Sequence, residues 1–97
     1  MKDPLDEFFK LLLGGWPHDL PPGTVQVRRK RLLFRVSLLY RVWEVYQQAA
    51  GREPEGLLAW CAAIRAKPYF SNHQVRSFTK PYHRHYAIDI TRLKQVA

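Results

Sequence analysis

The chain has 97 residues, 46% of them hydrophobic, and a formal net charge of +8 at pH 7. This length predicts a single domain with a modest core, and the hydrophobic content together with three tryptophans excludes a disordered tail. The single cysteine, Cys61, excludes an intrachain disulfide framework and a cysteine-cluster zinc site. Its apolar surroundings predict a buried free thiol, which suits a reducing compartment.

The sequence shows neither a secretory signal nor a membrane-spanning segment. Three acids precede the three-leucine run near the N-terminus, whereas a signal peptide carries cations there. The longest apolar run, residues 57–64, is far shorter than the ~18 residues that span a bilayer. We therefore expect a cytoplasmic protein with no membrane partner.

The first predicted element is a helix over residues 4–13. Asp3 can cap it, Pro4 fits its first turn, and the glycine pair at 14–15 can end it. Its apolar face would consist of Leu5, Phe8, Phe9, Leu12 and Leu13. Three prolines in residues 16–23 then predict a connecting loop.

The central prediction is one long helix over residues 28–50, the longest run without glycine or proline. Its apolar side chains recur at spacings of three and four and cover most of its circumference, which is typical of a buried helix. A strand competes locally, because alternate residues between Phe34 and Val42 are apolar. The helix is favoured because no turn residue precedes Gly51. Residues 24–27 are either an extended entry or the cap of this helix.

A third helix is predicted to start around Pro54, since proline suits a first turn. It should end before Lys67 and Pro68, because the residue preceding a proline is disfavoured in the helical conformation. Its buried side would consist of Leu57, Leu58, Trp60, Cys61 and Ile64.

The basic and aromatic tail allows two arrangements. In the favoured one, Ser71 caps a short helix over residues 72–79, and residues 86–90 form a strand that a last helical turn follows. In the rival arrangement, residues 74–79 pair with residues 86–90 as a hairpin.

These elements together predict a mainly α fold, a single domain over residues 1–97 with a core of three helices. Its parts are an N-terminal helix and proline-rich loop (1–23), a helical core (24–66) and a basic C-terminal unit (67–97). The third helix and residues 72–79 would form a helix-turn-helix. With the strand that follows, the layout resembles that of winged-helix DNA-binding domains, in the order of elements and without a shared motif.

Positive charge lies in two segments. Residues 24–50 carry six cations and one acid, and residues 65–97 carry seven cations and one acid. Such segments attract polyanions, and amide and arginine side chains can read base edges, so we expect binding of DNA or RNA. The candidate nucleic-acid-binding residues are Arg28, Arg29, Lys30, Arg31, Arg35, Lys67, Asn72, His73, Gln74, Arg76, Lys80 and Arg84.

Three alternatives to this interpretation stay open. The acids of the first helix could neutralise the four cations at 28–31. Exposed tyrosines beside prolines, Tyr69 and Tyr82, could stack on single-stranded bases. The cationic and aromatic surface could also bind an acidic protein partner, as an adaptor, inhibitor or complex subunit. The sequence does not indicate the oligomeric state.

No catalytic or metal-binding motif stands out. The chain lacks a glycine-rich phosphate loop and a nucleophile elbow. His73, His83 and His85 have no carboxylate or thiolate at a spacing usual for a metal site. We therefore expect a non-catalytic protein with no metal and no cofactor.

Overall fold

The computed structural model describes residues 3–71 and 84–96, and over these residues the protein is a mixed α/β domain. Its elements are, in chain order, α1 (Pro4–Leu13), β1 (Val25–Arg28), β2 (Arg31–Arg35), α2 (Val36–Ala49), α3 (Leu57–Arg65), β3 (Phe70–Ser71), β4 (His85–Asp89) and α4 (Ile90–Gln95). The prediction of a mainly α fold is therefore wrong. The four strands form one antiparallel sheet in the order β1-β2-β4-β3.

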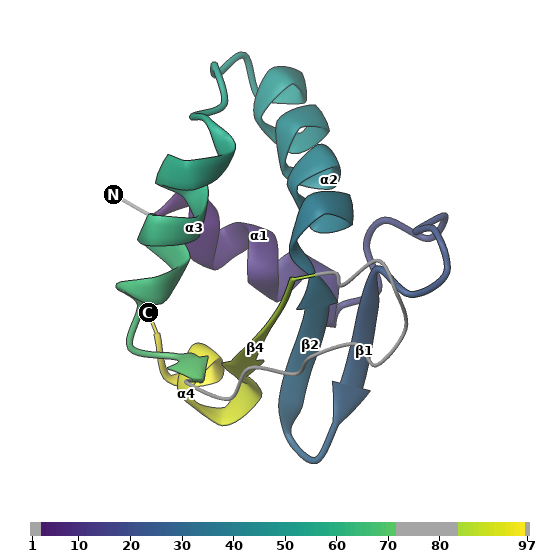
Figure 1. Ribbon diagram of the computed structural model, residues 1–97, viewed down its shortest axis with the longest axis vertical. Coiled ribbons are helices and arrows are strands. Elements are labelled where there is room, and N and C mark those ends of the chain that lie inside the picture. Colours follow the sequence, from purple (N-terminus) through teal and green to yellow (C-terminus); the bar gives the residue numbers. More distant parts are fainter. Residues whose placement is uncertain (1–2, 72–83, 97) are drawn as a thin grey trace.

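The helices surround this sheet on one face and at both ends. Figure 1 shows α1 behind the sheet, α2 rising from the end of β2, α3 alongside at the left, and α4 beside the lower end of β4. The Cα radius of gyration is 12.9 Å, close to the ~13 Å of a single domain of about 100 residues. The β1–β2 hairpin projects at the end away from α2 and α3 (Figure 1).

Helix α1 confirms the first prediction because its start and stop signals are local. The Asp3 carboxylate accepts a hydrogen bond of 2.8 Å from the Leu5 backbone N–H, and Gly14 is the C-cap. Four of the five predicted apolar residues are buried, Leu5, Phe8, Phe9 and Leu12, while Leu13 is half-buried.

The predicted helix over residues 28–50 is wrong over residues 28–35. Residues 31–35 form β2, and α2 starts directly afterwards at Val36. The chain does turn before Gly51, at Arg29 and Lys30, although neither residue is typical of a turn. A turn without glycine, asparagine or proline leaves no signal in the sequence, so the uninterrupted run has the pattern of one long helix.

Strand β2 is stabilised by the core contacts of one of its two faces. Leu32 and Phe34 are 1% exposed and point toward the helices, and in register they lie opposite Ile88 and Tyr86 of β4. The alternation of a strand suits this arrangement because it buries every second side chain. A helix that is apolar around most of its circumference would have to be buried on all sides. Here only one face of residues 31–35 contacts the core, which suits a strand.

Helix α3 begins later than predicted. Its N-cap is Gly56, and the preceding residues are held against α2. The Trp43 indole N–H donates to the Glu55 carboxylate at 2.5 Å, and the Tyr40 hydroxyl donates to the Glu55 backbone carbonyl at 2.5 Å. Both contacts come from α2, 12 and 15 residues before Glu55, so the sequence directly around Pro54 could not show them.

The burial predicted for α3 is correct only in its second half. Trp60, Cys61 and Ile64 are at most 1% exposed, whereas Leu57 is 40% exposed and Leu58 is 79% exposed. The later start of the helix explains this, because its first turn lies outside the core that its second turn contacts.

The tail contains one confirmed strand. Residues 85–89 form β4, which pairs with β2 and with β3. Both the predicted helix over 72–79 and the rival strand over 74–79 lie outside the described residues. The residues expected to be the turn of a helix-turn-helix instead include Phe70, the first residue of β3. Helix α4 is capped by Asp89, whose carboxylate accepts from the Arg92 backbone N–H at 3.1 Å.

Candidate nucleic-acid interface

Four consecutive cations lie at the tip of the β1–β2 hairpin. Arg29 and Lys30 form its two-residue turn, and their φ angles of 49° and 63° both lie in the left-handed region. Hairpin turns of this kind usually contain asparagine and glycine, because the left-handed conformation costs other residues roughly 1–2 kcal/mol each. Two cationic side chains therefore occupy positions that the turn itself disfavours.

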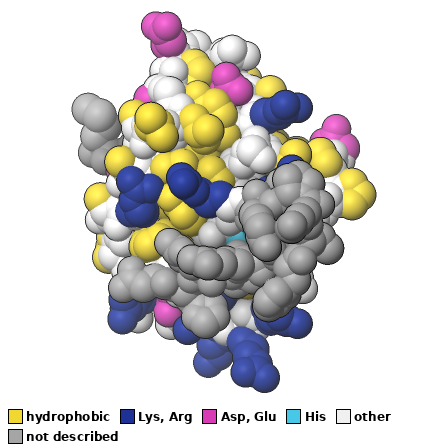
Figure 2. Space-filling model, in the orientation of Figure 1, with side chains coloured by type: hydrophobic (Ala, Val, Ile, Leu, Met, Phe, Trp, Pro, Cys, Tyr) yellow, Lys and Arg dark blue, Asp and Glu magenta, His cyan; other side chains and the backbone are white. Residues whose placement is uncertain are grey.

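One acid lies near the four cations of the tip: Asp89 of β4 is opposite Arg31 in register. Arg28 and Arg31 flank the turn and lie directly opposite each other, an arrangement of like charges that destabilises a strand pair. Figure 2 shows Lys and Arg side chains gathered at the lower end of the molecule, where Figure 1 places the hairpin. Within residues 3–71 and 84–96, the ion pairs join Lys67 to Asp3 and to Asp6, and the hairpin takes part in none.

Two of the three acids at the start of α1, Asp3 and Asp6, pair with Lys67. The Lys67 ammonium pairs with the Asp3 carboxylate and lies 3.0 Å from the Asp6 carboxylate, which also accepts a 2.6 Å hydrogen bond from the Tyr69 hydroxyl. These two carboxylates therefore do not neutralise the hairpin. Lys67, a candidate contact in the sequence, has its charge balanced inside the protein and lies apart from the tip.

The same cluster shifts the pKa of three of its members. Burial alone would raise the pKa of Asp3, but hydrogen bonds from Lys67 and from the Leu5 N–H, with the lysine charge, hold it below its ordinary value. Burial alone would lower the pKa of Lys67, and Asp3 and Asp6 outweigh that effect and raise it. Burial and the adjacent Asp6 raise the pKa of Tyr69.

Replacing Lys67 with methionine should lower the free energy of unfolding at neutral pH by roughly 1 kcal/mol, the value of a charged hydrogen bond reduced for partial exposure. Because the pKa of Asp3 is depressed in the folded state, its contribution is present above the unfolded value, near 3.8, and is lost as the pH falls further. The raised pKa of Lys67 means that its contribution is present below 10.5 and is lost at higher pH. Urea unfolding across this range measures both slopes.

The K67M variant should therefore lose less stability than the wild type below pH ~4. Lys94→Met, at an exposed position on α4, is the matched control and should follow the wild-type curve. Equal acid slopes for the wild type and K67M would contradict this account of the cluster.

Strand alternation places further cations on the face of the sheet that points away from α1. Arg31, Leu33 and Arg35 share that face of β2, and Arg28 joins them because it lies opposite Arg31. Arg35 lies opposite His85 and is half-buried, and its Nε atom is buried with no hydrogen-bond partner among the described residues. The hairpin thus presents a basic row that continues from its tip toward α2.

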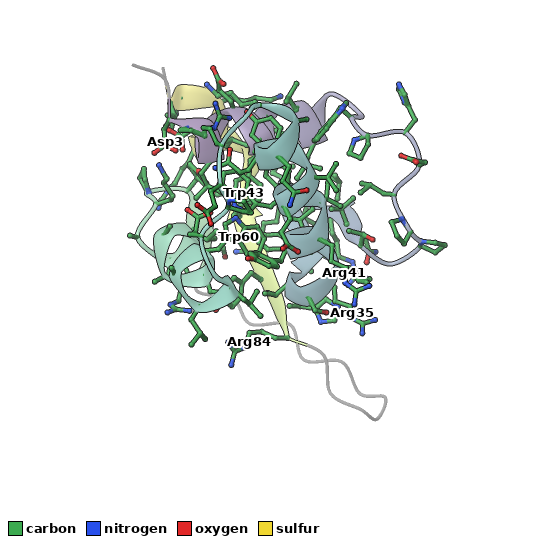
Figure 3. All side chains as sticks on the ribbon, turned by 90° about the horizontal axis from the view of Figure 1, so that it is seen from above. Asp3, Arg35, Arg41, Trp43, Trp60 and Arg84 are labelled. Carbon is green, nitrogen blue, oxygen red and sulfur yellow. The ribbon has the colours of Figure 1, made fainter. Side chains whose placement is uncertain are left out.

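A second group of cations lies where α2 begins. Figure 3 shows Arg35, Arg41 and Arg84 on the same side of the molecule. The Val36 N–H donates to the Arg84 carbonyl at 3.0 Å, so Arg84 is adjacent to the first turn of the helix. Cations at a helix N-terminus oppose its dipole, which an anionic partner would offset. Arg31 and Arg35 are four residue steps apart along β2, a distance of ~13 Å.

The other sequence candidates divide into two sets. Asn72, His73, Gln74, Arg76 and Lys80 lie outside the described residues. Tyr69, expected to be exposed for base stacking, is fully buried, so that expectation is wrong. The preceding residue, Pro68, suggested that Tyr69 is exposed. The Tyr69 hydroxyl instead donates a hydrogen bond to the Asp6 carboxylate of α1.

Two residues near the basic surface were missed by sequence reasoning. Gln26 is exposed on β1, and Arg41 is exposed on α2. Gln26 alternates with Val25 and Val27, a signal that identifies an outward position only once residues 25–28 are recognised as a strand. Arg41 has no such signal, because its proximity to Arg35 depends on how β2 leads into α2.

Replacing Arg29 and Lys30 with asparagine and glycine should raise the free energy of unfolding by about 1–2 kcal/mol, because both new residues accept the left-handed conformation. The same change removes two cations from the tip and should weaken nucleic-acid binding. Urea unfolding and a binding titration on one preparation measure the two effects. Arg29→Gln with Lys30→Gln removes the same charge without relieving the backbone and should leave stability close to the wild-type value.

Comparison of the chain with protein-family models, with curated protein sequences and with solved structures gives no match. In the part of the chain that the structure describes, no helix is both long enough and apolar enough to cross a bilayer. The same residues contain no group of three or more His, Cys, Asp or Glu side chains that could hold a metal ion.

Proposed function

We propose that this protein binds nucleic acid without catalysis, through phosphate contacts from the tip of the β1–β2 hairpin. One observation carries the proposal: four consecutive cations are exposed on a projecting turn, and among the described residues none of them forms an ion pair, although Asp89 of β4 lies opposite Arg31. A phosphate backbone supplies the regularly spaced negative charge that such a surface favours. The buried thiol of Cys61 supports a cytoplasmic location for this activity.

The energetics of the tip favour a functional role for its charges over a purely structural one. The turn disfavours Arg29 and Lys30, and the opposed pair Arg28 and Arg31 repels itself, so all four side chains are unfavourable for the isolated hairpin. Bound phosphates would relieve the repulsion between Arg28 and Arg31. The four side chains could contact these phosphates without any rearrangement of the core. Arg35, Arg41 and Arg84 supply a second set of positive charges on the same protein.

Fluorescence anisotropy with labelled DNA and RNA, each as duplex and as single strand, tests the proposal. Four phosphate contacts predict a slope of log affinity against log salt near −3.6, so binding to duplex DNA should weaken about 10²-fold between 50 and 200 mM salt. An affinity that does not change with salt, or no binding at low salt, would contradict the proposal.

A protein-binding adaptor is the second candidate, and a separate observation favours it. Leu57 and Leu58 are 40% and 79% exposed at the start of α3, and Val45 of α2 is 63% exposed. Figure 2 shows hydrophobic side chains over the upper part of the molecule, where Figure 1 places α2 and α3. Failure to bind any nucleic acid at low salt would favour this adaptor function, with an acidic protein as partner.

A further inference from the structure

We propose, on the basis of the nucleic-acid binding proposed above, that the β1–β2 hairpin enters the major groove of duplex DNA and that Gln26 contacts base edges there. Beyond nucleic-acid binding in general, this proposal specifies duplex DNA as the partner and Gln26 as a residue that determines sequence preference. It rests on the shape of the hairpin, on the side chains of its outer face, and on where the aromatic rings lie.

The shape of the hairpin suits the major groove. β1 is an edge strand that only β2 flanks, and all of residues 26–31 are exposed. Val27, on the face that points toward the helices, is itself 63% exposed, so the hairpin extends beyond the core. A major groove of about 12 Å admits a two-stranded β-ribbon, whose strands lie ~4.8 Å apart.

The outer face of the hairpin carries the side-chain types that read bases. Gln26 lies opposite Leu33, and Arg28 lies opposite Arg31, so Gln26, Arg28 and Arg31 share this face. Glutamine can bind adenine with two hydrogen bonds, and arginine can bind guanine in the same way. Alternate residues of a strand are about 6.8 Å apart, which corresponds to two base-pair steps of DNA.

The aromatic rings of the described residues do not favour a single strand as the partner. Proteins that bind single strands stack bases on exposed rings. In this sheet, Phe34 and Tyr86 are 1% and 4% exposed and belong to the core, and Tyr69 beside β3 is fully buried. Phe70 of β3 is half-buried and packs edge-on against the Tyr86 ring at 5.4 Å. Duplex RNA is disfavoured as well, since its major groove is too deep and narrow for a side chain to read.

Two measurements on the full chain test this proposal. In the first, anisotropy at one salt concentration compares duplex DNA, duplex RNA of the same sequence, and single-stranded DNA. Duplex DNA should bind about tenfold or more tightly than the other two. In the second, duplexes are selected from a random DNA library by the wild type, by Gln26→Ala and by the exposed control Gln48→Ala on α2.

The wild type and Q48A should select the same sequences, whereas Q26A should lose an adenine preference of about 5- to 150-fold at one position. Gln26→Glu, which keeps the side-chain length, should shift that preference toward cytosine. Equal binding of duplex RNA or single strands, or selection by Q26A that matches the wild type, would overturn this proposal and leave nucleic-acid binding intact. No binding to any of the three nucleic acids would overturn both.

Discussion

Replacing Arg28, Arg29, Lys30 and Arg31 together with glutamine should lower the affinity for duplex DNA about 10³- to 10⁴-fold at ~0.1 M salt. Each cation that neutralises a phosphate releases a counterion, and this release contributes close to one logarithmic unit of affinity at that salt concentration. The net charge falls from +8 to +4, because four cations are removed. The slope of log affinity against log salt should become shallower by about 3 to 4.

A charge-matched pair of variants separates the hairpin from the general positive charge of the protein. Arg29→Gln with Lys30→Gln removes two cations at the tip, whereas Lys10→Gln with Arg52→Gln removes two on α1 and after α2. Only the first pair should reduce affinity strongly, by about 50-fold at ~0.1 M salt. An equal loss for both pairs would mean that net charge, and not the tip, attracts the nucleic acid.

Replacing Phe34 with alanine should lower the free energy of unfolding by about 3–5 kcal/mol. The Phe34 ring is 1% exposed and lies 5.6 Å from the ring of Phe9, 6.4 Å from that of Trp60 and 6.1 Å from that of Tyr86. Truncation therefore opens a cavity between β2, β4, α1 and α3. Domains of this size have roughly 5–15 kcal/mol of total stability, so F34A should be near the limit of folding.

Urea unfolding followed by circular dichroism measures this loss, and Val45→Ala is its control. Val45 is 63% exposed, so its truncation should change the free energy of unfolding by less than about 0.5 kcal/mol. A cost below about 1 kcal/mol for F34A would contradict the position of β2 in the core, and with it the placement of the hairpin.

The parts of the fold that the sequence predicted are those whose signals are local. Asp3, Pro4 and Gly14 define α1 within a few residues, and the alternation around Tyr86 marks β4. The hairpin could not be predicted in this way, because Arg29 and Lys30 adopt a turn conformation that their side chains disfavour. Because this turn was missed, β2 and α2 were predicted as a single helix, which changed the predicted fold class.

In the candidate site too, the sequence predicted the features that depend on neighbouring residues and missed those that depend on distant ones. The four cations at the tip are consecutive, so the sequence alone identifies them as a run of charge. Gln26 has no such signal, because its position on the outer face depends on its register with Leu33. Lys67 is a candidate by charge alone, and its pairing with Asp3 joins residues that are far apart in sequence.

Titration of duplex DNA into isotope-labelled protein, followed by NMR of the backbone amides, tests most directly whether the hairpin is the nucleic-acid surface. The largest shift changes should fall on Gln26, Arg29 and Arg31, with smaller ones at Arg35 and Arg84 where the basic row continues. Amides of the exposed first turn of α3 should not respond. Changes confined to α3 and its connection to α2, with an unaltered hairpin, would contradict the account.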